Sequence, residues 1–325
     1  MANLSVKYAG LTLKSPVIIS SSGITSNIQK IESLSDMNAG AIVLKSLFEE
    51  QINHESSSLM NNEDFPEAAD YIFNYTRSNS LQSYLELIEA SKSRTDIPIL
   101  ASINCVSGNE WIDYAKKIED AGADALELNI FLLPNDKEKK AKYYEENYLD
   151  IVTKVIEKVK IPVTVKLGMY FTNMLHIIDE LYKRGVKGVV LFNRFYSPDI
   201  DIHKMEITSS EVFSTENDIR HSLRWIGLAS SVNKEIDLSA STGVHNGEGV
   251  IKQLLAGASA VQVCSTLYKN GIDIVEEIVN DVEKWMDDKG FKSITEFKGK
   301  LNYGNIPNPE MYERAQFMKY FASID

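Results

Sequence analysis

Short apolar runs, rich in β-branched residues, alternate along the chain with longer segments in which apolar residues recur at helical spacing. Each short run is typical of a buried strand, and the runs begin near residues 16, 41, 98, 125, 162, 188, 236 and 259. A helical pattern follows each of these runs. Strict alternation predicts parallel strands with helices outside, and eight units over about 290 residues fit an α/β fold of the (β/α)8 TIM barrel type.

Glycine and proline mark the junctions between the predicted helices and strands. Four helical patterns end in a glycine shortly before an apolar run, and we interpret these glycines as left-handed helix caps. They are Gly40, Gly122, Gly185 and Gly257. Ile97-Pro98 and Ile161-Pro162 open two other strands. An open doubly wound sheet is the alternative, but it usually has a G-x-G-x-x-G turn after its first strand, and Ser20-Ser21-Ser22-Gly23 lacks that spacing.

Several segments fall outside the repeating pattern. Two short apolar runs flank Ala9-Gly10 and predict an N-terminal β-hairpin. Residues 48–77 and 193–217 are polar and irregular, and both follow strand ends, so we expect long loops over the C-terminal face of the barrel. Residues 291–325 are expected to form a C-terminal surface extension without chemistry. We therefore interpret residues 1–325 as a single barrel domain.

Composition narrows the class of protein. The chain has 325 residues, 44% of them hydrophobic, and a net charge of −12, which argues against non-specific binding of nucleic acid. Its two cysteines, Cys105 and Cys264, imply no disulfide framework. No apolar run has the length of a membrane span, and no signal peptide is recognisable. We expect a soluble cytoplasmic protein, and the scattered histidines predict no metal site.

Polar residues gather where the predicted strands end. In a barrel these ends meet at one face, where active sites lie. The set comprises Ser22, Gly23, Lys45, Ser46, Ser102, Asn104, Asn129, Lys166, Asn193, Ser241, Thr242, Gly243, Cys264 and Ser265. A lysine at the end of a buried strand must be solvated or paired, and here it would point at a ligand or reach out to solvent. Lys166 and Lys45 both hold such positions.

The last two strand ends favour a phosphate site. Loops after the seventh and eighth strands of such barrels often hold phosphate on backbone N–H groups. Ser241-Thr242-Gly243 and Cys264-Ser265-Thr266 occupy those places. Gly243 permits close approach of a ligand to the backbone, and the hydroxyl groups add donors.

The order and spacing of these segments resemble the class 1 dihydroorotate dehydrogenase family over residues 3 to 300. The matching pieces are Ser15-Pro16, Ser21-Ser22-Gly23, Gly40 to Ser46, Glu127-Leu128-Asn129, Pro134-Asn135, Val165-Lys166-Leu167, Asn193, Thr242-Gly243-Val244 and Gln262-Val263. The resemblance implies an FMN-dependent (β/α)8 barrel, commonly a homodimer, that oxidises the small molecule dihydroorotate to orotate in pyrimidine biosynthesis.

The resemblance also implies roles for individual residues. The implied flavin contacts are Ser22, Gly23, Lys45, Ser46, Asn104, Asn129 and Lys166, and the implied phosphate contacts are Thr242, Gly243, Cys264 and Ser265. Lys166 would place positive charge near the N1–O2 edge of the flavin and stabilise its anionic reduced form. The implied substrate contacts are Lys45, Asn129, Asn135 and Asn193.

The chain departs from the family pattern near the substrate, which is typical of a divergent, dihydroorotate dehydrogenase-like branch. The family has a cysteine or serine base where this chain has Ile130-Phe131-Leu132-Leu133. Tyr170 or Cys105 could supply a base, but no motif places either residue. The family's Asn-Ser-Met-Gly loop is absent, with Phe73 to Arg77 near its place. Phe213-Ser214-Thr215 replaces the glycine-rich turn after the sixth strand.

Two other functions stay open at this point. A lysine desolvated at a barrel strand end can attack a carbonyl, so a Schiff-base lyase that uses Lys166 or Lys45 is one alternative. A flavin-binding barrel that does not turn over dihydroorotate is the other, because the usual base is missing. The sequence leaves the true substrate and the electron acceptor open.

Overall fold

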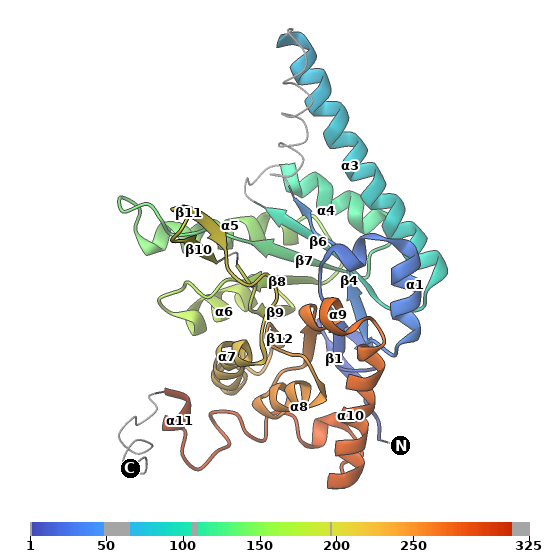
Figure 1. Cartoon of the computed structure of the whole chain (residues 1–325), viewed down its shortest axis with the longest axis vertical. Coiled ribbons are helices and arrows are strands. Elements are labelled where there is room, and N and C mark those ends of the chain that lie inside the picture. The colour runs from blue at the N-terminus through green and yellow to red at the C-terminus, as the bar shows by residue number, and fades with distance from the viewer. Residues whose placement is uncertain (1, 49–65, 106–109, 196, 314–325) are drawn as a thin grey trace.

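Eight parallel strands close into a barrel in the computed structural model of the chain, which describes residues 2–48, 66–105, 110–195 and 197–313 (Figure 1). The strands are β3 (Val17–Ile19), β4 (Ala41–Val43), β6 (Ile99–Cys105), β7 (Ala125–Ile130), β8 (Val163–Leu167), β9 (Gly188–Leu191), β12 (Asp237–Ser241) and β13 (Ala260–Val263). Each pairs in parallel with its neighbours, and the β4–β6 pairing closes the ring. The predicted barrel and its eight strands are confirmed.

Helices surround the barrel. They are α1 (Ile28–Asp36), α3 (Pro66–Arg94), α4 (Glu110–Asp120), α5 (Ala141–Ile156), α6 (Met174–Lys183), α7 (Ile219–Val232), α8 (Gly247–Ala256), α9 (Ser265–Asn270), α10 (Ile274–Lys289) and α11 (Glu310–Glu313). Short 3-10 turns occupy Gly23–Ser26, Glu216–Asp218 and Ile294–Glu296. Among the described residues, no helix combines the length and the apolar character that a membrane crossing requires.

Three of the four predicted glycine caps are confirmed, and one is wrong. Gly122, Gly185 and Gly257 have the positive φ angles expected of left-handed caps, from 93° to 116°. Gly40 does not, and Asn38, with a φ of 58°, adopts the left-handed conformation instead. Gly40 is required for a different reason, because an added Cβ would lie 2.0 Å from the Ser15 carbonyl oxygen.

The N-terminal hairpin closes one end of the barrel. Its strands β1 (Val6–Tyr8) and β2 (Leu11–Leu13) pair antiparallel, as predicted. The Tyr8 side chain is fully buried, and its ring lies so close to Gly188 that an added Cβ there would be 3.2 Å away. Ala9 and Gly10 both have positive φ angles, which suits a tight two-residue turn.

Both long segments predicted as loops contain regular structure, so these predictions are wrong in part. After β4, the short strand β5 (Leu47–Phe48) pairs with β6, and α3 already begins at Pro66; residues 49–65 lie outside the described residues. After β9, strands β10 (Pro198–Asp201) and β11 (Glu206–Ser209) form an exposed hairpin (Figure 1). Ile200 and Ile207 lie directly opposite each other in the two strands, and such an apolar cross-strand pair stabilises a hairpin.

The start of the C-terminal extension packs against the barrel instead of lying free on its surface. Ile294 and Phe297 are buried, and the Phe297 ring meets Trp285 of α10 edge to face, with centroids 5.0 Å apart. Backbone hydrogen bonds join Gly299 to Leu254 of α8 and Tyr303 to Gly227 of α7. The described part of the extension therefore covers parts of α7, α8 and α10, and Tyr312 of α11 also lies against Gly227 of α7.

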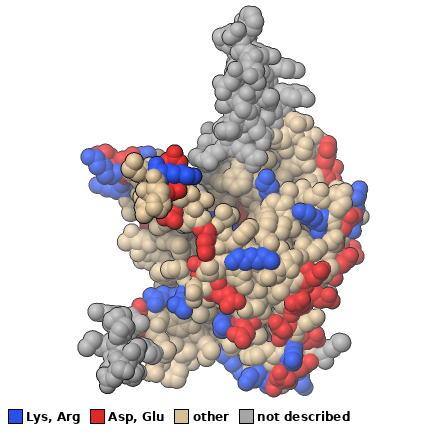
Figure 2. All heavy atoms as spheres, viewed as in Figure 1, with Lys and Arg blue, Asp and Glu red and all other residues tan. Residues whose placement is uncertain are grey.

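Acidic side chains gather on one visible edge of the molecule. Figure 2 shows them along the right-hand side, where α1 and α10 lie. Helix α10 carries Glu276, Glu277, Asp281, Glu283, Asp287 and Asp288. A face of this sign repels phosphate backbones.

Candidate active site

A cavity of about 570 Å³ opens at the carboxyl ends of the barrel strands. Its wall is built from the ends of β3, β8, β12 and β13, and residues 193–195 and 209–214 close it on the side of the β10–β11 hairpin. This is the end of a (β/α)8 barrel at which enzymes place their chemistry. The volume lies in the range that small-molecule and cofactor sites span, about 300–1,000 Å³.

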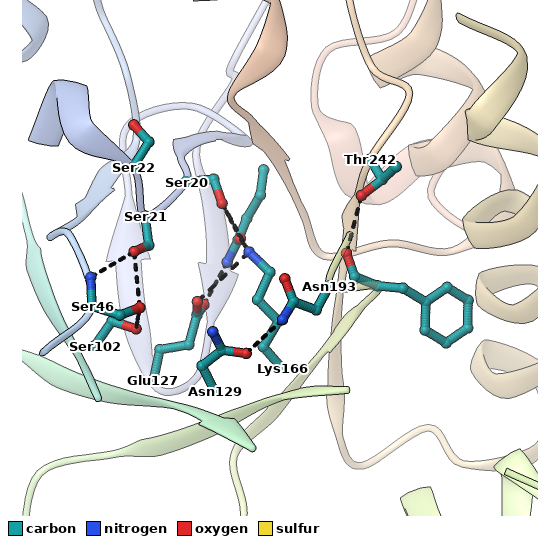
Figure 3. A network of polar contacts seen from close by, with 12 residues as sticks. Ser20, Ser21, Ser22, Ser46, Ser102, Glu127, Asn129, Lys166, Asn193 and Thr242 are labelled. Carbon is teal, nitrogen blue, oxygen red and sulfur yellow. Dashed lines mark hydrogen bonds and ion pairs between the residues drawn. The ribbon is translucent and has the colours of Figure 1, made fainter. Parts of the chain in front are cut away.

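Lys166, at the end of β8, forms the floor of this cavity (Figure 3). Its Nζ donates hydrogen bonds to Ser20 Oγ and to Gln262 Oε1, both at 2.9 Å. Only 8% of the lysine side chain is exposed to solvent, so these two acceptors replace most of the hydrogen bonds that water would otherwise make with the ammonium group. This strand-end lysine therefore lines a cavity, one of the two positions that its place in the sequence allowed.

A buried carboxylate lies beneath the lysine. Glu127 of β7 is completely buried, and its Oε1 lies 3.9 Å from Lys166 Nζ. The other oxygen, Oε2, accepts a hydrogen bond of 2.6 Å from Gln262 Nε2. Glu127, Gln262 and Ser20 were not among the predicted site residues. The available signal was that Glu127 and Gln262 are polar residues within otherwise apolar strands.

Serine hydroxyls connect β3, β4 and β6 beside the lysine (Figure 3). Ser21 Oγ lies 3.0 Å from Ser46 Oγ and accepts the Ser46 backbone N–H, and Ser46 Oγ lies 2.7 Å from Ser102 Oγ. Ser22 instead caps the 3-10 turn that follows it, by accepting the N–H of Ile24. The predicted residue Ser46 therefore belongs to a buried network next to the cavity.

Two of the predicted asparagines pair with each other beside Lys166, and the other two lie apart from that pair. Asn193 Nδ2 donates to Asn129 Oδ1 at 2.9 Å, so these two side chains meet beside Lys166 (Figure 3). The buried Oδ1 of Asn104 has no hydrogen-bond partner among the described residues. Asn135 is exposed and does not line the cavity. Lys45 is half-buried and also lies outside the cavity wall.

The loop after β12 has an unusual backbone. Thr242 and Gly243 have φ angles of 78° and 81°, in the left-handed region. A β-branched residue adopts this conformation rarely, and such outliers concentrate at functional sites. Thr242 Oγ1 donates to the Phe192 carbonyl oxygen at 3.1 Å, which helps hold the turn (Figure 3). Gly243 N–H donates a long hydrogen bond of 3.4 Å to Ser214 Oγ.

Three segments meet around Ser214 at this end of the cavity. Ser214 N–H donates to Ser265 Oγ at 3.0 Å, and Ser214 Oγ lies 3.0 Å from Nε2 of the buried His245. Lys269 Nζ donates to the Ser214 carbonyl oxygen at 2.8 Å. Burial, and then the positive charge of Lys269, lower the pKa of His245. Sequence reasoning missed His245 and Lys269, because neither follows a strand directly.

Cys264, Gly23 and Ser265 are three further predicted positions. Cys264 lines the cavity at the end of β13, and burial raises the pKa of its thiol while the charge of Lys166 offsets part of that effect. An added Cβ on Gly23 would lie 3.1 Å from the Tyr268 hydroxyl, so this predicted position borders the α9 segment. Ser265 lines the cavity as well.

Aromatic rings gather around Phe131, which belongs to the segment where the resemblance implies a base in the family. The Phe131 and Phe195 rings have centroids 3.9 Å apart, and Tyr170 stacks on Phe195 at 5.6 Å. Tyr170 is 55% exposed, so its hydroxyl reaches solvent at the mouth. The side chain of Cys105 lies outside the described residues. Arg194 donates to the carbonyl oxygens of Glu211 and Val212, which ties the segment after β9 to the end of the β10–β11 hairpin.

No cluster of three or more histidine, cysteine, aspartate or glutamate side chains in the described part of the chain could hold a metal ion. Apart from Arg194 and Glu211 beside the β10–β11 hairpin, the polar groups of the described cavity wall are hydroxyls, amides, the Cys264 thiol, the Lys166 ammonium group and backbone N–H groups. Such a set suits an organic ligand with carbonyl oxygens and an anionic group better than it suits a cation.

Comparisons with known proteins agree with this geometry. A sequence model described as dihydroorotate dehydrogenase matches residues 3–286. The chain is 26% identical over 308 residues to the catalytic subunit of dihydroorotate dehydrogenase B (NAD(+)) of Thermoplasma acidophilum, covering 92% of this chain and 99% of that protein. It is 29% identical over 315 residues to the corresponding subunit of Alkaliphilus metalliredigens, with 92% and 99% covered. It is 25% identical over 327 residues to dihydroorotate dehydrogenase (fumarate) of Lachancea kluyveri, with 93% and 99% covered. The chain therefore belongs to the dihydroorotate dehydrogenase family.

Proposed function

We propose that the protein is an FMN-dependent oxidoreductase that oxidises a dihydropyrimidine-like substrate of the dihydroorotate type. Family membership indicates an oxidoreductase that acts on a CH–CH bond. The observation that supports the cofactor most directly is Lys166, a buried ammonium group at the floor of a cavity at the C-terminal face. An ammonium in that place favours a ligand that gains negative charge during the reaction.

The residues of the cavity fit a flavin mononucleotide. Lys166 has a third N–H to offer at the floor, where a ring with carbonyl oxygens would lie, and Ser20 and Gln262 hold the ammonium in place by accepting its other two. Asn129 and Asn193 lie beside them. When bound, the flavin supplies the acceptor for a hydride from the substrate. The contribution of the chain is to hold the ring, to exclude water and to offer positive charge where electrons arrive.

The opposite end of the cavity fits a phosphate group. Thr242 and Gly243 present a left-handed turn, and the Gly243 N–H has only its long contact with Ser214 Oγ among the described residues. Ser265 adds a hydroxyl group from the next loop. Lys269 adds positive charge nearby through its contact with Ser214. Backbone and hydroxyl donors backed by a cation are typical of phosphate sites.

The substrate side supplies no acid–base group from the expected segment. Oxidation of dihydroorotate also removes a proton from C5, and a positioned base typically contributes about 10²–10⁴ in rate. Phe131 stacks on Phe195 where that base would stand. The proposed enzyme should therefore oxidise dihydroorotate slowly, and its own substrate should carry a more acidic proton or use another base.

A Schiff-base lyase is less well supported. A nucleophilic lysine must turn toward a carbonyl carbon, but Lys166 Nζ is held by two acceptors and lies 3.9 Å from Glu127 Oε1. Lys45 does not line the cavity. Borohydride in the presence of a carbonyl substrate should therefore trap no adduct on either lysine, and a trapped adduct on Lys166 would replace the oxidoreductase with the lyase.

The cofactor can be tested directly. The purified protein should show a flavin absorption spectrum, and denaturation should release FMN, identified by mass. A colourless protein that does not bind added FMN would refute the proposal. Removal of the ammonium in Lys166→Ala should make the bound flavin harder to reduce. The matched variant Lys187→Ala, at the other end of the barrel, should leave the potential unchanged.

Turnover is tested separately from binding. FMN-loaded protein is mixed anaerobically with dihydroorotate, and bleaching of the flavin is followed with time. We expect bleaching slower by about 10²-fold or more than in relatives that have a cysteine or serine base. Bleaching at the rate of those relatives would show that another residue acts as the base. No bleaching with any dihydropyrimidine, despite bound flavin, would favour a binding protein without this activity.

A further inference from the structure

The carboxylate beneath Lys166 has no role in the function proposed above. Glu127 is fully buried inside the barrel. Its Oε2 accepts a hydrogen bond from Gln262, but Oε1 has no hydrogen-bond partner among the described residues. A buried carboxylate is costly unless a charge balances it, and Lys166, 3.9 Å away, is the group that does so here.

The lysine is held close to this carboxylate but not in contact with it. An ammonium group has three N–H donors, and Ser20 and Gln262 accept two of them. At 3.9 Å from Nζ, Glu127 Oε1 is beyond hydrogen-bond distance. Glu127 therefore acts on Lys166 through its charge, and the third N–H remains available to a ligand in the cavity.

Gln262 keeps the two charged groups in this arrangement. Its amide oxygen accepts from Lys166 and from Ser20, and its amide nitrogen donates to Glu127. The reversed amide would place N–H groups against the ammonium and an oxygen against the carboxylate. The hydrogen-bond network thus permits one orientation of the Gln262 amide. In this orientation the amide bridges the Lys166 ammonium and the Glu127 carboxylate and prevents direct contact between them.

We propose that Glu127 is a positioning residue that sets how strongly Lys166 favours the reduced, anionic form of the flavin. This inference rests on the proposed function, because the flavin is the ligand that senses the charge. Inside the barrel the dielectric is low, so a carboxylate 3.9 Å from the ammonium cancels part of its field at the cavity floor. The site is thereby less cationic than Lys166 alone would make it, and the bound flavin is harder to reduce.

The test is the midpoint potential of bound FMN, measured by reductive titration against a reference dye in holoprotein. Glu127→Gln keeps the size of the side chain and removes its charge, so the potential should become more positive. The preference for reduced over oxidised FMN should rise on the order of tenfold. Glu127→Asp keeps the charge and should restore a potential close to that of the wild type. A purely structural role would shift both variants alike, and that result would overturn the proposal.

A second variant covers the case in which Glu127→Gln does not fold. Gln262→Leu keeps both charges but removes the amide that separates them, so Lys166 should close on Glu127 and the potential should become more negative. An unchanged or more positive potential would overturn the proposal. If wild-type protein binds no FMN, the proposed function and this inference both fail. If FMN binds but neither Glu127→Gln nor Gln262→Leu moves its potential, only the role of Glu127 fails.

Discussion

Gly243 shows how a single position can limit what the site loop tolerates. Its φ of 81° lies in the left-handed region, and an added Cβ would lie 2.1 Å from the backbone nitrogen of Ile219. Gly10 has the same φ of 81° but no atom within 4 Å of an added Cβ. Alanine substitutions at these two glycines therefore distinguish the energetic cost of the left-handed backbone conformation from the cost of steric overlap.

We expect Gly10→Ala to lower the free energy of unfolding by about 1–2 kcal/mol, the usual cost of the left-handed conformation for an L-residue. Gly243→Ala carries this cost and a backbone clash as well, worth about 1–3 kcal/mol more. Urea unfolding of both variants measures the difference. Equal losses in the two variants would mean that the loop after β12 can move away from Ile219.

His245 makes the site sensitive to acid. Its pKa is lowered chiefly by burial and then by Lys269, with Glu216 and Asp218 acting in the opposite direction. The folded state therefore binds a proton less readily than the unfolded state. By linkage, the stability associated with His245 is complete above the ordinary histidine pKa of about 6.5 and is lost as the pH falls below it.

Thermal unfolding checks this dependence. The melting temperature of the protein should fall between about pH 7.5 and pH 5.5, and His245→Gln should show a smaller fall because it has no imidazole to protonate. His203 is exposed, so His203→Gln serves as the control and should follow the wild type. An identical pH profile for all three proteins would exclude His245 as the source.

At the level of elements, the barrel could be predicted because buried parallel strands leave unbroken apolar runs in the sequence. Strand β8 (Val163–Leu167) is an example, with every residue buried. The hairpin of β10 and β11 could not be predicted in the same way. Its residues are almost all exposed, and its period of two is limited to two short stretches, Ile200 with Ile202 and Met205 with Ile207, within a polar segment.

The same reasoning explains which site residues the sequence indicated. Lys166 is the penultimate residue of β8 and Ser46 lies just beyond β4, so both are near strand ends, where the fold class alone predicts a ligand. Glu127 and Gln262 lie within strands, and only the register of the closed sheet decides that both face the barrel interior. His245 and Ser214 come from different loops, so their contact of 3.0 Å follows from tertiary structure alone.

At the scale of the whole molecule, the β10–β11 hairpin presents apolar surface to solvent. Ile200, Ile202, Met205 and Ile207 are between 61% and 87% exposed. An isolated two-stranded hairpin is marginally stable in water, so a second surface that covers this face would stabilise it. The face is a candidate contact in the homodimer that the resemblance implies.

Light scattering after gel filtration should give twice the chain mass of 36.5 kDa for the wild type. Ile200→Lys should shift the protein toward monomer, because it places a charge in a buried contact. Val232 at the end of α7 is 62% exposed, so Val232→Lys is a matched control and should leave the mass unchanged. A monomeric wild-type protein, or a dimer that Ile200→Lys does not dissociate, would show that this hairpin is not the dimer interface.

The buried ring of Tyr8 has a consequence for turnover. Because it blocks the far end of the barrel beside Gly188, molecules that must touch the floor of the cavity share one entrance. The reducing substrate and the electron acceptor would then have to bind one after the other, and the oxidised product must dissociate before the acceptor binds. With a small-molecule electron acceptor, double-reciprocal plots of the steady-state rate at several fixed acceptor concentrations should be parallel lines. An excess of either substrate should inhibit, because it binds the redox form of the enzyme with which the other substrate reacts.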